Sequence, residues 1–215
     1  MRRRQWMVDC SAWMLAAAAT GIWRPALAQR ATPRVVVLGD SLSAEYGIAR
    51  GSGWVALLQQ RLAAQAPGAE VVNASISGDT TSGGRSRLPA LLATHKPTHL
   101  IIELGGNDAL RGLSLAMTRD NLRAMVRAGK EARAKVLVVG MQLPPNYGAS
   151  YGRDFAALFG EVAKEEKVAL QPFLLAGIAD RADAMDWFQP DRIHPLAKAH
   201  PRMLDNVWQS LKPLL

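Results

Sequence analysis

The stretch RVVVLGDSL at residues 34–42 decides which fold is expected for this chain. The apolar run from Val35 to Leu38 ends at Gly39 and is followed at once by the polar residues Asp40 and Ser41. A short apolar run of this kind is typical of a strand that is buried on both faces, as in a parallel sheet. Ser41 is therefore expected just beyond the carboxyl end of the first strand, at the start of a helix.

The same alternation of apolar run and helical pattern continues to the end of the chain. Further short strands are expected at residues 71–72, 99–104, 135–139 and 168–170. Apolar residues at helical spacing predict helices around residues 54–62, 88–92, 122–126, 155–162 and 204–211. Strands that alternate with helices favour βαβ units, right-handed crossovers and a parallel sheet. The sequence thus predicts a single α/β domain without internal repeats.

Composition and charge narrow the classes of function. The chain has 215 residues, of which 49% are hydrophobic, and this is enough apolar material for one compact domain and too much for a disordered chain. The net charge is +8, but the arginines of the body are spread singly, as on a solvated surface, so nucleic acid is not expected as a partner. The single cysteine, Cys10, excludes an internal disulfide framework and a multi-cysteine metal site.

The first 28 residues have the pattern of an export signal. Three arginines stand at positions 2–4, and fourteen uncharged residues run from Cys10 to Trp23, too few for a membrane span of about 20 apolar residues. Ala26-Leu27-Ala28 then supplies the small-x-small pattern that signal peptidase accepts. We expect residues 1–28 to be removed, leaving a single domain at 29–215 with no stable membrane anchor. This domain would be periplasmic or secreted, by the general or the twin-arginine route.

Polar and glycine-rich clusters follow the predicted strands at the points where the strands end. They lie at residues 39–43, 73–79, 105–108 and, late in the chain, 191–195. In open parallel sheets, ligands bind outside the carboxyl ends of the strands, on the loops that lead into helices. We therefore expect these four clusters to converge on one edge of the sheet.

The residue types in these clusters suit acyl transfer. A serine such as Ser41 is a weak nucleophile until a neighbouring base takes its proton, and histidine is the usual base. Asp191 stands three residues before His194, so one turn can present both, and the carboxylate can then orient the imidazole. Negative charge that develops on the substrate oxygen needs hydrogen-bond donors. The backbone N–H of Gly78 and the side-chain amide of Asn107 are candidates.

Four short motifs together resemble the conserved blocks of the GDSL, or SGNH, hydrolase superfamily. They are GDSL from residue 39, the glycine at 78, GxND from 105 and DxxH from 191. The resemblance covers residues 34–215. It implies an α/β fold of the flavodoxin-like type, a three-layer α/β/α sandwich with a five-stranded parallel sheet. It also implies a catalytic triad of Ser41, Asp191 and His194, and an oxyanion hole formed by the backbone of Ser41 and Gly78 and the side chain of Asn107.

Longer stretches resemble one branch of this superfamily, the bacterial periplasmic acyl-CoA thioesterases, lysophospholipases and arylesterases. They include GDSLSAEYGI from residue 39 and QLPPNYGASY from residue 142. The branch implies a small acyl ester or thioester as substrate, with no cofactor and no metal. It also implies an acyl groove lined by the loop after the fourth strand, with the substrate-binding residues Leu143, Pro144, Asn146 and Tyr147. Glu45 and Arg192 stand where the branch usually has glycine. These two side chains are expected to change the shape and charge of the pocket rim, and thereby the substrate.

Three other interpretations are open from the residues alone. Ser150 lies in GASYG, which matches the G-x-S-x-G elbow of α/β-hydrolases, but two prolines separate it from the preceding strand and favour a flexible loop. Histidines at 95, 99, 194 and 200 lack the spacing of a zinc site. The alternative from a different class is a catalytically inert, flavodoxin-like lipid-binding protein of the periplasm. Intact Ser41, Asp191 and His194 argue against it.

Overall fold

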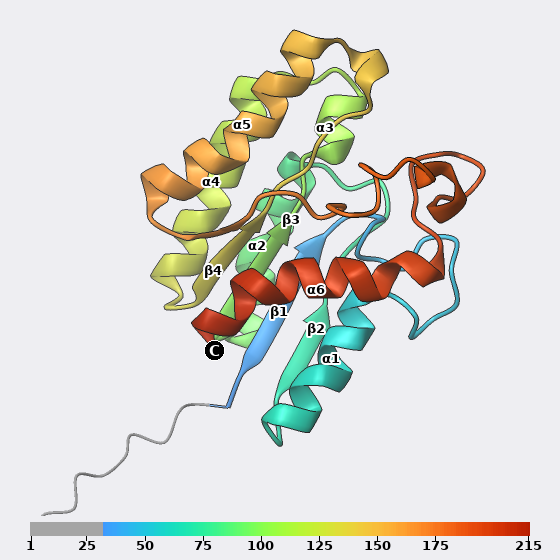
Figure 1. The fold of residues 1–215 in the computed structure, drawn as a ribbon. Coiled ribbons are helices and arrows are strands. Elements are labelled where there is room, and N and C mark those ends of the chain that lie inside the picture. Colours follow the sequence, from blue (N-terminus) through green and yellow to red (C-terminus); the bar gives the residue numbers. More distant parts are fainter. Residues whose placement is uncertain (1–31) are drawn as a thin grey trace, which may run out of the picture. The chain divides into compact units, whose positions relative to one another are not determined.

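Five parallel strands form a sheet at the centre of the structure (Figure 1). The structure is a computed structural model, and it describes residues 32–215. The expected signal peptide at 1–28 lies outside the described residues. The strand order is β2-β1-β3-β4-β5, which is the order of flavodoxin-like sheets. The strands are β1 (Arg34–Gly39), β2 (Glu70–Asn73), β3 (His99–Glu103), β4 (Lys135–Val139) and β5 (Ala169–Gln171).

Helices cover both faces of this sheet. On one face, α1 (Trp54–Gln65) packs against α6 (His200–Leu211). On the other, α4 (Leu115–Glu131) lies between α2 (Thr81–His95) and α5 (Ala149–Glu166). The result is the expected three-layer α/β/α sandwich with a five-stranded parallel sheet, and this prediction is confirmed.

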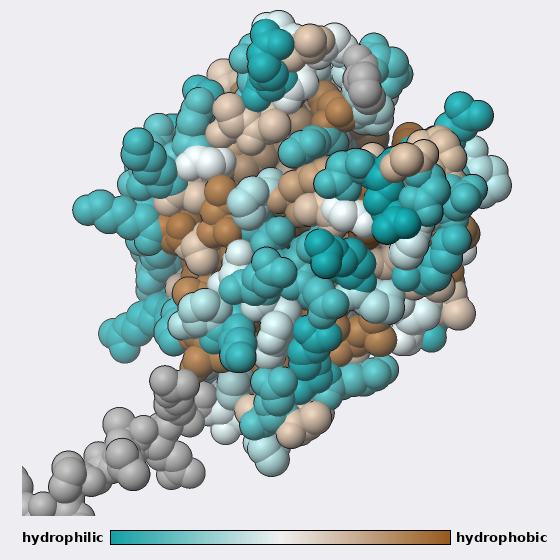
Figure 2. All heavy atoms as spheres, viewed as in Figure 1, coloured by the Kyte–Doolittle hydropathy of each residue, from teal (hydrophilic) through white to brown (hydrophobic). Residues whose placement is uncertain are grey.

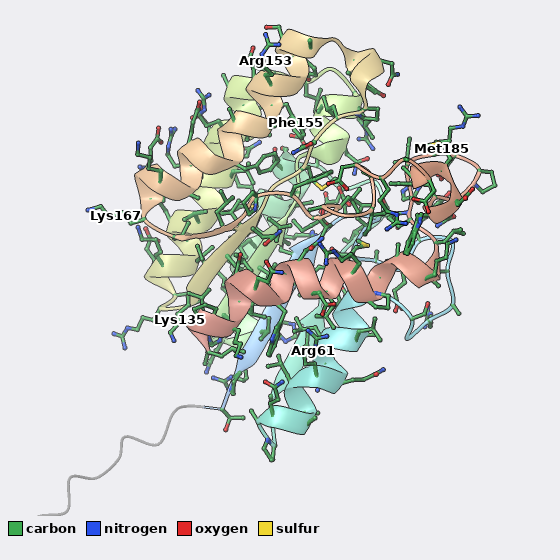
Figure 3. All side chains as sticks on the ribbon, viewed as in Figure 1. Arg61, Lys135, Arg153, Phe155, Lys167 and Met185 are labelled. Atoms are coloured by element: carbon green, nitrogen blue, oxygen red, sulfur yellow. The ribbon has the colours of Figure 1, made fainter. Side chains whose placement is uncertain are left out.

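The buried pattern explains why these residues form these elements. All five residues of β3 and the last five of β1 are buried, because helices cover both faces of the sheet centre. Phe155 and Phe159 of α5 are fully buried and meet edge to face, with ring centroids 5.2 Å apart; Phe155 can be located in Figure 3. Toward solvent, the face carrying α1 and α6 is largely hydrophilic (Figure 2). None of the described helices is long and apolar enough to span a bilayer.

Two local expectations are wrong. Ser41 does not begin a helix, because residues 41–47 form successive turns and α1 starts only at Trp54. Glu45 and Gly47 have φ angles of 60° and 71°, which a right-handed helix cannot accommodate. Ser150 lies in the first turn of α5 rather than in a loop. The shorter elements after β3 and β4, α3 (Gly106–Leu110) and the 3₁₀ turn η1 (Pro145–Tyr147), place further residues at the carboxyl edge.

α1 and α6 are joined by side chains at both ends of their contact. At the start of α1, the Trp54 N–H donates to Nδ1 of His200, the first residue of α6, over 3.0 Å. The preceding residue, Gly53, has no side chain to cap the helix, so the imidazole takes this role. Farther along, Arg61 of α1 forms an ion pair with Asp205 of α6 over 2.8 Å (Figure 3). Burial of the His200 ring lowers its pKa from 6.5 to about 4.

We expect His200 to make the stability of the fold pH-dependent between about pH 6.5 and pH 4. In this range the unfolded chain binds a proton at His200 and the folded chain does not, so the free energy of unfolding falls as the pH falls. Over the whole range the loss is at most about 3.5 kcal/mol, since one pKa unit corresponds to about 1.4 kcal/mol. Urea unfolding at pH 7 and pH 5 measures the first part of this loss, about 2 kcal/mol.

The variant His200→Asn should lose less stability on acidification than the wild type, because the asparagine Oδ1 takes the place of Nδ1 and accepts the Trp54 N–H without titrating. His95→Asn is the matched control and should behave as the wild type does. Equal losses in the wild type and His200→Asn would contradict the assignment.

Candidate active site

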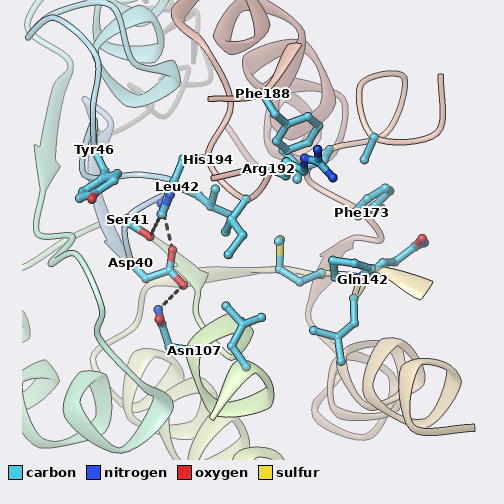
Figure 4. A pocket seen from close by; sticks show the side chains of 18 of the residues that line it. Asp40, Ser41, Leu42, Tyr46, Asn107, Gln142, Phe173, Phe188, Arg192 and His194 are labelled. Carbon is cyan, nitrogen blue, oxygen red and sulfur yellow. Dashed lines mark hydrogen bonds between the residues drawn. The ribbon is translucent and has the colours of Figure 1, made fainter. Parts of the chain in front are cut away.

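Ser41 and His194 meet at the carboxyl edge of the sheet, although 153 positions separate them in the sequence. Ser41 stands in the turn after β1, and its Oγ lies 2.8 Å from Nε2 of His194 (Figure 4). This is hydrogen-bond distance between a hydroxyl and the ring nitrogen that can take its proton. The two predicted residues are therefore in contact.

Asp191 completes the chain of hydrogen bonds on the other side of the imidazole. Its Oδ2 lies 2.7 Å from Nδ1 of His194, and its Oδ1 accepts the backbone N–H groups of Ile193 and His194, each over 3.0 Å. Partial burial opposes ionisation of this carboxyl, but the hydrogen bonds from His194 and Ile193 outweigh it and lower its pKa to about 2. Asp191 is therefore ionised throughout the neutral range and can hold the imidazole in one orientation.

The loop that carries His194 is held by contacts of its own. Phe188 and Pro195 form an isolated antiparallel bridge, and the Gln189 N–H donates to the His194 carbonyl over 2.7 Å. The Gln189 amide reaches the carbonyl of Tyr46, which ties this loop to the loop after β1. The Tyr46 ring lies against the imidazole, with centroids 4.3 Å apart. These contacts fix the position of His194 relative to Ser41.

Glu45 and Arg192 both have a φ of 60°. This left-handed region favours glycine, so the backbone at both positions is strained by the larger side chain. The Glu45 carboxylate offsets the strain by accepting the N–H groups of Gly51 and Gly53, the latter over 2.7 Å. The Arg192 side chain lines the cavity described below and adds a positive charge to it.

The expected oxyanion donors also lie at this edge. Within residues 32–215, the backbone N–H groups of Ser41 and Gly78 have no protein acceptor and are available to a ligand. Gly78 has a φ of 80°, and its carbonyl is held by Arg111 over 2.8 Å. The Asn107 amide lies in α3 and donates to Oδ2 of Asp40 over 3.1 Å (Figure 4).

A buried polar cluster joins the two loops that carry Gly78 and Asn107. Asp108 is fully buried and accepts the backbone N–H of Thr81 over 2.8 Å, as well as the hydroxyl groups of Thr81 and Thr118. Because Thr81 opens α2 and Asp108 belongs to α3, this carboxylate fixes the spacing of the two helix starts. The aspartate after Asn107 therefore has a structural role that the sequence analysis did not assign.

Asp40 and Glu103 are a second feature that the sequence analysis missed. Both residues are buried, with 2% and 0% of their surface exposed; Asp40 directly follows β1, and Glu103 is the last residue of β3. A signal was present in the sequence, because an acidic residue closes the otherwise apolar strand that ends at Glu103. An acid in a run buried on both faces indicates a specific polar partner.

An apolar cavity of about 730 Å³ opens beside the serine. Leu143 and Pro144, two of the predicted substrate-binding residues, line it. Asn146 and Tyr147, the other two, lie in η1 and are not among the lining residues. Leu42 of the first motif and Met141 of the loop after β4 also line the cavity, and the apolar walls include residues that the sequence analysis did not name: Leu110, Phe173, Leu175 and Phe188.

Ser150 lacks the surroundings of a nucleophile elbow. That motif needs a sharp turn from a strand directly into a helix. Here η1 and Gly148 precede Ser150, and β4 ends at Val139. The Ser150 side chain is exposed and has no histidine partner among the described residues.

A parallel α/β sandwich with serine, histidine and aspartate joined at its carboxyl edge is the arrangement of an SGNH-type serine hydrolase. Residues 37–202 match the model of the GDSL-like Lipase/Acylhydrolase family, and the chain belongs to this family. The resemblance seen in the sequence motifs is thereby confirmed.

Named relatives are similar over most of the chain. Esterase TesA of Pseudomonas aeruginosa is 52% identical over 187 residues, which cover 87% of this chain and 92% of that protein. A protein of Escherichia coli named thioesterase 1/protease 1/lysophospholipase L1 is 40% identical over 185 residues, 86% of each chain. A crystal structure of TesA superposes with a TM-score of 0.81 at 52% identity, covering 85% of this chain and 99% of that one.

Proposed function

We propose that this protein hydrolyses acyl esters or thioesters through an acyl-enzyme on Ser41. The observation that carries the proposal is the continuous contact from Ser41 Oγ to His194 and on to Asp191, over 2.8 Å and 2.7 Å, at the mouth of an apolar cavity. Relatives named esterase, thioesterase/lysophospholipase and arylesterase support the same reaction class.

We propose the following role for each residue. As Ser41 Oγ attacks the acyl carbon, His194 Nε2 takes its proton, and the Asp191 carboxylate stabilises the imidazolium that forms. The carbonyl oxygen becomes an oxyanion, and the N–H groups of Ser41 and Gly78 with the Asn107 amide are the proposed donors to it. His194 then protonates the departing alcohol or thiol. A water molecule, deprotonated by His194, releases the acid from Ser41.

The cavity favours an apolar acyl chain. Its walls are largely aliphatic and aromatic, with Leu143, Pro144 and Met141 on the loop after β4. Each methylene removed from water contributes about 0.8 kcal/mol, so binding in such a cavity should strengthen with chain length. We therefore propose that Leu143 and Pro144 form part of the acyl site.

The inert lipid-binding protein is the alternative with the same cavity. A carrier needs apolar walls but no activated serine, and it has no use for an imidazole held between a serine and an ionised carboxylate. A lipid-binding function therefore does not explain the hydrogen bonds that join Ser41, His194 and Asp191. Catalysis accounts for both features at once.

We expect Ser41 to be the essential serine. Ser41→Ala should lower the hydrolysis of a p-nitrophenyl ester by roughly 10⁴-fold or more, because it removes the nucleophile and leaves only the oxyanion donors. Ser150→Ala is the matched control and should retain near wild-type activity and labelling by a fluorophosphonate. An inactive Ser150→Ala beside an active Ser41→Ala would overturn the proposed site. An inactive, unlabelled wild type would favour the binding protein.

We expect Leu143 to set part of the chain-length preference. In the wild type, kcat/KM for p-nitrophenyl esters should rise from acetate to longer acyl chains until the cavity is full. Leu143→Asp places a carboxylate in the apolar wall and should lower the preference for long chains by about tenfold, the equivalent of roughly two buried methylenes. Met117→Asp, at an exposed apolar residue outside the cavity lining, is the control. A wild-type profile that peaks at acetate and is unchanged in Leu143→Asp would contradict the acyl site.

For localisation, we propose export followed by cleavage after Ala28, on the pattern of residues 1–28. Mass spectrometry of the protein from the periplasm should find Gln29 as the first residue. Ala28→Arg should block processing, because the peptidase requires a small residue at this position. Recovery of the intact wild-type chain from the cytoplasm alone would contradict the proposal.

A further inference from the structure

Two buried carboxyls, Asp40 and Glu103, lie close to Ser41, since Glu103 contacts the residues at positions 40 and 43, and the proposed mechanism does not use them. Asp40 precedes Ser41 in the chain, and Glu103 closes the neighbouring strand β3. Neither takes part in an ion pair with any residue of the described segment. A buried carboxylate without a cationic partner is costly, so its hydrogen bonds decide which form it takes.

The surroundings of Glu103 suit the protonated form. Its Oε2 accepts the Ser43 hydroxyl over 2.7 Å and the Asp40 N–H over 3.3 Å, while its Oε1 is buried without a partner among residues 32–215. Burial first, and the neighbouring Asp40 carboxylate second, raise the pKa of Glu103 well above its ordinary value. When two carboxyls lie this close, one proton is kept by the pair.

The surroundings of Asp40 suit the ionised form. Its Oδ1 accepts the Leu42 N–H over 3.0 Å, and its Oδ2 accepts the Asn107 amide over 3.1 Å. Burial raises the pKa of Asp40 to about 6, but the Leu42 N–H, the nearby His194 ring and the Asn107 amide all oppose that rise, whereas the charge of Asp79 adds to it. At neutral pH the negative charge of the pair therefore rests on Asp40, and the proton on Glu103.

This arrangement matters because Asn107 has two amide hydrogens. One is bound by Asp40, and this contact fixes the plane in which the other can lie. An oxyanion donor acts through its fixed orientation, so that no reorganisation is needed when charge develops. A donor that is already bound to a carboxylate resists rotation away from the substrate more than one bound to water does.

We propose that Asp40 is a positioning residue for ester hydrolysis, whose carboxylate orients the Asn107 amide toward the oxyanion, while Glu103 holds the proton that lets Asp40 remain charged. This inference rests on the proposed function, because it assigns Asp40 a role through the proposed oxyanion donor. Asp40 touches neither the substrate nor the reacting atoms in this role.

A double-mutant cycle tests whether Asp40 acts through Asn107. Alone, Asn107→Ala should lower kcat by about 10²–10³-fold with little change in KM, as loss of one oxyanion donor does. Asp40→Asn removes the charged acceptor and should lower kcat by about tenfold or more, again with KM nearly unchanged. In the double variant, the loss should equal that of Asn107→Ala alone within about threefold, because the two residues act as a unit.

The controls separate positioning from a general loss of structure. Asp205→Asn removes an exposed carboxylate remote from the site and should leave kcat unchanged. Glu103→Gln keeps a neutral, hydrogen-bonding group and should lose less activity than Asp40→Asn. If the Asp40→Asn and Asn107→Ala losses multiply in the double variant, the assignment of Asp40 is overturned. An Asn107→Ala variant with wild-type kcat would also overturn it, because Asp40 is proposed to act through that amide. A wild type without esterase activity would instead contradict the proposed function itself.

A spectroscopic measurement needs no substitution at Asp40 and therefore does not depend on the folding of that variant. In His194→Gln, which removes the imidazole titration, the side-chain amide signals of Asn107 should shift above about pH 6, because loss of the His194 charge removes one of the contacts that lower the pKa of Asp40. Asn107→Ala identifies these signals by their loss. Signals that stay constant from pH 4.5 to pH 8 would overturn the proposed contact.

Discussion

The close approach of β1 and β3 at their carboxyl ends is the constraint on which the site depends. Gly39 pairs with Glu103 in the parallel register, and a Cβ added at Gly39 would lie 2.8 Å from both Glu103 Oε2 and the Ser43 side chain. Only glycine leaves room for the buried carboxyl there. The same approach brings the turn that carries Ser41 beside α3, which carries Asn107. Gly39 is thus required for the packing of β1 against Glu103, and this packing sets the positions of Asp40 and Ser41, which follow it.

The second half of the site comes from the far end of the chain and is held by different means. The loop before α6 has no strand to fix it. It is instead closed by the Phe188–Pro195 bridge and joined to the first loop through Gln189 and the Tyr46 ring. A non-glycine residue in the left-handed region, such as Arg192, costs roughly 1–2 kcal/mol. The loop keeps its shape because Asp191 binds two backbone N–H groups as well as the imidazole.

The two carboxylates near Ser41, those of Asp191 and Asp40, have different pKa values because their surroundings differ. Asp191 is partly exposed to solvent, with 37% of its side chain accessible, and bound by three donors, so it is ionised at any pH near neutrality. Asp40 is buried and bound by two donors, and its pKa lies near 6 because burial works against its charge. In the proposed mechanism, Asp191 orients the base and Asp40 orients a donor.

Apolar runs and helical spacing are local signals, and by themselves they determined the α/β class, the parallel sheet and the strand positions. The short polar motifs supported the family resemblance, which implied the three-layer sandwich and the candidate triad. The sequence also predicted that the loop after the fourth strand contributes to a groove; Leu143 and Pro144 line the cavity, whereas Asn146 and Tyr147 do not. It did not reveal that Ser41 stands in a series of turns, because the φ angles of Glu45 and Gly47 are not encoded by composition alone. The Asp40–Glu103 pair, the Asp108 cluster and the cavity walls formed by Leu110, Phe173 and Phe188 were decided only by the tertiary structure. Each of these joins segments far apart in the chain, and whether two such segments touch depends on packing, which no local pattern records.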